Sequence, residues 1–92
     1  MENKDIPNIE IENLPDGWDV ADHVEKERIF RHTSGLEVIL GYNDRLNDPW
    51  FAELFDPAEG SIETESDSDE RKARGGAIRF MRMVSEIEGR VQ

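Results

Sequence analysis

The sequence predicts an α+β fold in which a four-stranded antiparallel β-meander is packed on one face by a single C-terminal amphipathic helix. Four short stretches rich in aromatic and β-branched residues follow one another between residues 18 and 55, separated by turn-forming residues. The last quarter of the chain instead repeats apolar residues at helical spacing. With 92 residues and no cysteine, the chain can build one modest core, and no disulfide contributes to it.

The predicted strands cover residues 18–24, 28–33, 36–42 and 50–55. The connections between them are short and polar. Residues 25–27 form a tight reversal, Ser34 and Gly35 form a two-residue hairpin loop, and residues 43–49 form a longer loop. Pairing each strand with its neighbour along the chain predicts a meander.

Two further segments flank this sheet in the sequence. Residues 1–17 contain two prolines and a glycine around the alternating pair Ile9 and Ile11, which predicts an extended N-terminal arm with one candidate edge strand. Residues 18–92 then form the single α+β domain. Within it, residues 56–67 are polar, acidic and rich in turn formers, so we expect an acidic linker there.

The linker leads into a helix predicted over residues 69–88. Ser66 or Ser68 can cap its N-terminus, and Asp69 and Glu70 place negative charge in its first turn, where the helix dipole favours it. At 100° per residue, one stripe of the helix is apolar and should pack on the sheet. The stripe consists of Ala73, Ala77, Phe80, Val84, Ile87 and Val91.

Apolar residues are expected on both faces of the sheet, although one helix can cover only one face. Pairing through the shortest turns places four of them together on the face that we predict to be exposed: Trp18, Val20, Phe30 and Ile39. A register slip of one residue would exchange the faces of a strand. The face without the helix must meet the N-terminal arm, a second subunit or a ligand.

The back of the predicted helix carries the one basic cluster of the chain. Its members, predicted to bind a partner, are Arg71, Arg74, Ile78, Arg79 and Arg82. An isoleucine among arginines, with Gly75 beside it, is typical of a contact surface. The alternative is that these arginines pair with Glu70, Glu86 and the acidic segment before the helix.

No catalytic or metal-binding pattern is visible in the sequence. His23 and His32 are isolated, and a metal site would need further imidazole or thiolate ligands. His32 is expected to face Glu37 across a hairpin as an ordinary cross-strand pair. The serines show no spacing typical of a nucleophilic triad. We therefore expect no enzyme activity, no cofactor and no required metal.

The charge balance is the most informative feature of the composition. Acidic residues number 22 against 11 basic ones, only three of which are lysine, and the net charge is −11. Repulsion among so many like charges destabilises a small compact protein in dilute salt, and molar salt screens this repulsion. Because the acids are spread along the whole chain, the composition indicates a protein of a halophilic archaeon or its virus. Without a signal peptide or an apolar run of about 18 residues, it is expected in the cytoplasm, away from membranes.

Two functions follow as expectations. The first is a non-enzymatic protein-interaction module that binds a protein partner or a second copy through the exposed sheet face or the helix. The alternative is a small nucleic-acid-binding or transcription-associated protein that uses the arginine face, with Trp18 or Trp50 stacking on bases.

Overall fold

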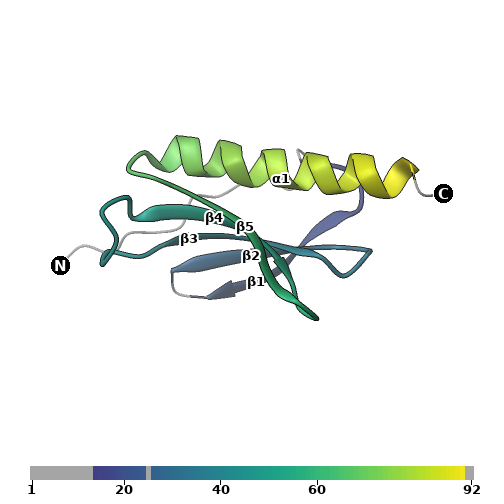
Figure 1. The fold of residues 1–92 in the computed structure, drawn as a ribbon, viewed down its shortest axis with the longest axis horizontal. Helices are drawn as coiled ribbons and strands as arrows, with labels where there is room; N and C mark the ends of the chain where they lie inside the picture. Colours follow the sequence, from purple (N-terminus) through teal and green to yellow (C-terminus); the bar gives the residue numbers. More distant parts are fainter. Residues whose placement is uncertain (1–13, 25, 91–92) are drawn as a thin grey trace.

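The computed structural model describes residues 14–24 and 26–90. These residues form five strands and one helix, namely β1 Trp18–Val24, β2 Glu27–His32, β3 Glu37–Tyr42, β4 Trp50–Asp56, β5 Gly60–Asp67 and α1 Glu70–Arg90. The strands lie in chain order and every neighbouring pair is antiparallel. The helix crosses one face of the sheet (Figure 1). The predicted α+β meander with a C-terminal helix is confirmed, while the candidate edge strand at Ile9 and Ile11 lies outside the described residues.

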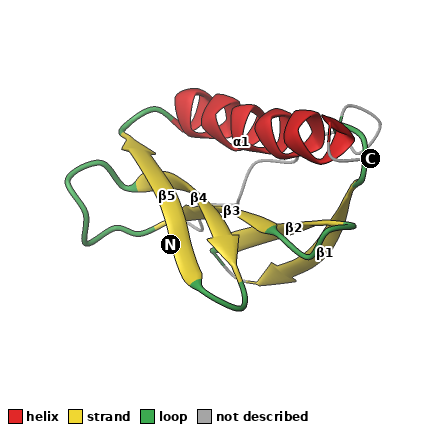
Figure 2. Cartoon of the chain, turned by 45° about the vertical axis from the view of Figure 1, so that its right-hand side comes forward, coloured by secondary structure: helices red, strands yellow, loops and turns green. Residues whose placement is uncertain are grey.

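Strand β5 corrects the prediction of an acidic linker over residues 56–67. A β-turn with Pro57 in its second position reverses the chain after β4, and the Glu59 N–H donates to the Asp56 carbonyl at 3.0 Å. Gly60 follows with a φ of 103°, a conformation that suits glycine. The returning strand pairs with β4 along its length (Figure 2).

The acidic composition of β5 fits its place at the edge of the sheet. Five of its eight residues are exposed. Charged side chains on an edge strand discourage pairing with another chain, so natural sheets often place them there. A polar, acidic segment can therefore be a strand when a turn places it beside an existing one.

The hairpin between β2 and β3 also differs from the prediction. Its loop has three residues, Thr33 to Gly35, in place of the expected two. The His32 N–H donates to the Leu36 carbonyl at 2.8 Å, which closes the loop, and the Gly35 N–H donates to the His32 carbonyl at 2.9 Å. Gly35 has a φ of 101°, as three-residue hairpin loops require at that position.

This extra loop residue shifts the register of β3 and changes which residues the helix covers. Phe30 lies opposite Val38, and Ile39 is on the other face. Trp18 and Phe30 are buried at 4% and 0% exposure, and Val20 packs against the same core. The prediction that these three residues form an exposed face with Ile39 is therefore wrong, and only Ile39 lies on the face opposite the helix.

The core lies between the sheet and α1. The helix contributes Ala73, Ala77, Phe80, Met81 and Val84, which confirms most of the predicted stripe. Ile87 is an exception, because it is 53% exposed near the C-terminal end of α1, and Val91 lies outside the described residues. The Trp18 indole N–H donates to the Met81 carbonyl at 2.9 Å and fixes β1 to the helix.

Asp69, and not Ser66 or Ser68, caps the N-terminus of α1. Its carboxylate accepts a hydrogen bond from the Arg71 N–H at 2.9 Å, and its carbonyl accepts one from the Ala73 N–H at 3.2 Å. The carboxylate contact satisfies one of the backbone N–H groups that every helix leaves free at its start, and the carbonyl contact is the first i to i−4 bond of the helix.

Candidate functional site: an open sheet face and a polar pocket

The sheet face opposite α1 has an apolar centre. Alternate residues of each strand point away from the helix, and the register places Ile29 opposite Ile39, with Phe51 on the neighbouring strand. Phe55 lies on the same side, and all four side chains are half-buried. No described element covers this surface. We call it the open face and define its centre as Ile29, Ile39, Phe51 and Phe55.

Gly41 gives the open face part of its shape. It lies directly opposite Phe51, and a Cβ atom at Gly41 would be 2.5 Å from the Phe51 ring. The ring therefore lies against the Gly41 backbone, and any larger residue there would displace it. This contact holds an aromatic surface in place before any partner binds.

Carboxylates surround this apolar centre. Among the described residues, the strand register places five of them on the same side of the sheet, at Asp19, Asp22, Glu27, Glu37 and Glu53. One cation of the strands accompanies them, since the Arg31 guanidinium donates to Glu37 at 2.7 and 3.0 Å. In the loops beside Phe51, Lys26 pairs with Asp44, so this pair adds no net charge. Five negative charges against one positive charge leave the open face with an excess of four negative charges.

The predicted arginine cluster lies on the outer side of α1, and most of its charge is paired. Three of its four arginines contact acids among the described residues, as one of the two alternatives predicted. The pairs are Arg71–Asp69 at 3.9 Å, Arg74–Glu70 at 3.5 Å and Arg79–Glu65. This pairing reduces the positive charge available to bind phosphate groups.

The remaining members of the cluster also differ from expectation. Ile78 is half-buried, so it does not project as a free apolar anchor, whereas Arg82 is exposed. Trp18 and Trp50, the predicted stacking groups, are 4% and 8% exposed. Neither ring is presented on the surface for stacking on a base.

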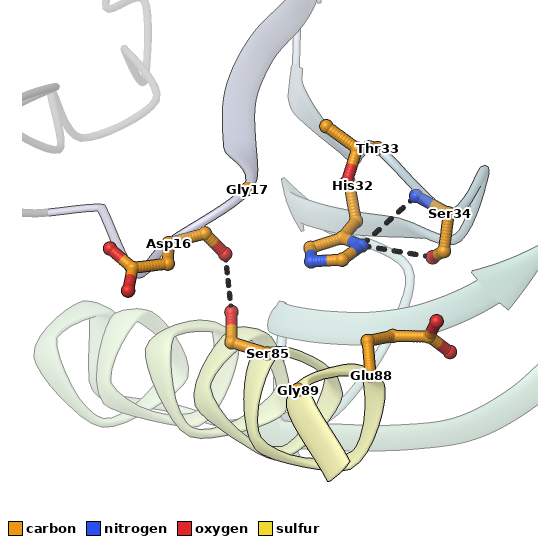
Figure 3. A pocket seen from close by; sticks show the side chains of 8 residues that line it. All are labelled: Asp16, Gly17, His32, Thr33, Ser34, Ser85, Glu88 and Gly89. Carbon is orange, nitrogen blue, oxygen red and sulfur yellow. Dashed lines mark hydrogen bonds between the residues drawn. The ribbon is translucent and has the colours of Figure 1, made fainter. Parts of the chain in front are cut away.

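A pocket of about 540 Å³ lies near the C-terminal end of α1 (Figure 3). Three segments far apart in the sequence form it, namely the turn before β1, the loop between β2 and β3, and the last turns of the helix. The lining residues are Asp16, Gly17, His32, Thr33, Ser34, Ser85, Glu88 and Gly89. Sequence reasoning did not find this site, because no single segment carries its pattern.

His32 is the central side chain of this pocket. It is 6% exposed, and its ring packs on Trp18 with centroids 5.2 Å apart. Its Nδ1 atom accepts a hydrogen bond from the Ser34 N–H at 3.0 Å and lies 2.9 Å from the Ser34 hydroxyl. The predicted pairing of His32 with Glu37 is wrong, because the register places Arg31 opposite Glu37.

A second contact, between the helix and the turn before β1, holds the pocket together. The Ser85 hydroxyl donates to the Asp16 carbonyl at 2.6 Å, which ties α1 to the turn before β1. Gly17 allows the close approach of His32, since a Cβ atom there would be 2.5 Å from the imidazole Nε2.

The described part of the chain contains neither a cluster of candidate metal ligands nor a candidate membrane-spanning helix. It has no group of three or more His, Cys, Asp or Glu residues placed to hold a metal ion. Nor does it contain a helix long and apolar enough to cross a membrane.

Comparison with family models, with curated proteins and with solved structures finds no match for this chain. A function must therefore be inferred from the geometry and chemistry of its own residues.

Proposed function

We propose that this protein is a non-enzymatic interaction module whose open face binds a basic amphipathic segment of a partner protein. The observation that carries the proposal is an apolar centre inside an acidic rim, on a side of the sheet that no described element covers. Apolar patches with polar rims are typical of protein-binding surfaces.

The apolar centre supplies the affinity in this proposal. Aromatic side chains such as Phe51 and Phe55 are frequent anchors in interfaces, because each buries a large area in a fixed geometry. Burial of apolar surface contributes roughly 25 cal/mol per Å² before the costs of association are subtracted. Gly41 holds the Phe51 ring in place, which lowers the cost of ordering it.

The rim decides which partner fits. A partner with lysine or arginine beside its apolar residues would meet the four excess carboxylates of the open face. Complementary charges speed association and select the correct partner. A second copy of this chain would instead bring two acidic rims together, and such like-charge contacts are unfavourable.

A binding assay with a designed peptide tests the proposal. A labelled amphipathic helical peptide, with leucines at positions i, i+3, i+4 and i+7 and lysines on the rest of its surface, is titrated with the protein, and fluorescence anisotropy reports binding. A control peptide keeps every lysine but replaces leucine by serine. We expect the first peptide to bind more tightly, because only its leucines can pack on the apolar centre of the open face. If attraction between charges alone drove binding, the two peptides would bind equally.

Two matched variants locate the binding surface. Ile39→Thr removes an apolar side chain from the centre of the open face without changing charge, and should weaken peptide binding about tenfold, or about 1.4 kcal/mol. Ile87→Thr, made at an exposed position of α1, should leave binding unchanged. Equal affinities of the two variants, or self-association of the protein alone under the same conditions, would reject the proposal.

A further inference from the structure

A second pocket, of about 530 Å³, opens at one end of the open face. Strands and loops both contribute to its lining, which includes Val24, Lys26, Glu27, Asn43, Asp44 and Phe51. The strand register places Val24 opposite Glu27, and the same row continues across the sheet through Gly41 to Phe51. This Phe51 pocket therefore continues the surface that we propose to bind a basic partner.

The strand side of the Phe51 pocket is apolar. A Cβ atom at Gly41 would lie 2.5 Å from the Phe51 ring and 3.0 Å from the Glu27 Cγ atom, so both groups lie against the Gly41 backbone. Val24 follows Glu27 in the row and is 43% exposed. An aromatic ring and aliphatic groups in one pocket suit the methylene groups of a long side chain.

The loop side of the Phe51 pocket is acidic. Glu27 and Asp44 each bring a carboxylate against the single ammonium group of Lys26, so the described lining residues have an excess of one negative charge. The Lys26 Nζ atom lies 3.9 Å from Asp44 Oδ2, and the two side chains are 49% and 64% exposed. Such a long, exposed ion pair contributes little stability, so a cation in better geometry can replace Lys26.

We infer that the Phe51 pocket takes an arginine side chain of the partner, an inference that rests on the function proposed for the open face. The arginine methylene groups pack on Val24 and the Phe51 ring, and the guanidinium donates two parallel hydrogen bonds to the Asp44 carboxylate. Arginine fits this pocket better than lysine does. Its planar guanidinium stacks on aromatic rings and matches both carboxylate oxygens, whereas the lysine ammonium is a compact, strongly hydrated charge.

Two peptides of equal charge test the choice of arginine. The amphipathic peptide of leucines and lysines is compared with one in which every lysine is replaced by arginine. We expect the arginine peptide to bind the protein about three- to tenfold more tightly, measured by fluorescence anisotropy. Attraction between charges at long range contributes equally to both peptides, so the ratio of their affinities reports the local contacts of arginine.

Two matched variants locate these contacts. Asp44→Asn keeps the size of the side chain and removes its charge, so the ratio of the two affinities should fall to about one. Asp48→Asn removes the same charge from an exposed position of the same loop, outside the lining of the Phe51 pocket. It should leave the preference for arginine unchanged.

The outcomes separate this inference from the proposed function on which it rests. Equal affinities of the two peptides for the original chain would overturn the inference, as would a preference for arginine that both asparagine variants reduce equally or that Asp44→Asn leaves intact. In each of these cases, weaker binding of both peptides to Ile39→Thr would still support the open face. If neither peptide binds the original chain, the proposed function fails and the inference fails with it.

Discussion

Gly17 is the residue on which the start of the sheet and the His32 pocket both depend. Its φ of 87° is a conformation that residues with a side chain rarely adopt. A Cβ atom there would also lie 2.5 Å from His32 Nε2, inside van der Waals contact. We expect Gly17→Ala to lower the free energy of unfolding by about 2 to 3 kcal/mol, measured by urea denaturation.

Gly35 provides the matched control for this substitution. It has a similar positive φ of 101°, but a Cβ atom there would meet no other atom within 4 Å. Gly35→Ala should therefore cost only the backbone strain, about 1 kcal/mol. If both alanine variants lose equal stability, the contact with His32 does not constrain position 17.

Single residues also show where sequence reasoning stopped. The sequence predicts two isolated histidines, and the structure places His23 at an exposed position of β1 and His32 in a buried position against Trp18. The pocket around His32 could not be predicted, because Gly17, Ser34 and Ser85 meet only after the helix packs on the sheet. The turn-forming residues Ser34 and Gly35 did indicate the loop that positions His32, but not its length.

Among the secondary-structure elements, α1 contains a glycine that the fold does not need. Gly75 is exposed, and a Cβ atom there would meet nothing within 4 Å. Alanine is favoured over glycine inside a helix by about 0.8 to 1 kcal/mol. Gly75→Ala should therefore raise the free energy of unfolding by about that amount, measured by thermal and urea unfolding.

The next residue of the helix gives the comparison. A Cβ atom at Gly76 would lie 2.8 Å from the Glu65 carboxylate, which pairs with Arg79. Gly76→Ala gains the same helix propensity but must displace that side chain, so its net gain should be smaller. A gain as large as that of Gly75→Ala would show that Glu65 moves aside without cost.

The elements differ in how well the sequence predicts them. Strands β1 to β4 and helix α1 are confirmed to within a few residues, because their apolar periodicity reflects which face is buried. Strand β5 was missed, since an edge strand with exposed acidic side chains lacks that periodicity. The register of β3 was wrong because it depends on one loop residue, and alternation alone is equally consistent with either face.

In the whole molecule, the fold keeps three regions apart. The helix covers one sheet face, the open face lies on the opposite side, and the His32 pocket lies near the C-terminal end of α1. Part of the acidic excess lies on the open face, which has an excess of four carboxylates, and part lies in the wall of the His32 pocket, which contains two. A net charge of −11 spread in this way indicates repulsion throughout the folded state rather than at one site.

This distribution predicts that salt stabilises the fold. Screening shortens the range of charge interactions from about 10 Å at 0.1 M salt to about 3 Å at 1 M, and a compact chain suffers more repulsion than an unfolded one. We expect the melting temperature to rise between these concentrations of KCl, by about 4 to 8 °C for each kcal/mol of repulsion removed. Circular dichroism at both concentrations measures the change.

A variant with fewer charges distinguishes screening from a general effect of salt on apolar burial. Glu59 and Glu63 are exposed and make no ion pair among the described residues. Replacing both by glutamine should raise the melting temperature in dilute KCl and reduce its further rise at 1 M, because less repulsion remains to be screened. If salt stabilises the variant as much as the original chain, repulsion between carboxylates is not what limits its stability. The acidic excess would then need a different physical explanation, such as selection of the basic partner proposed for the open face.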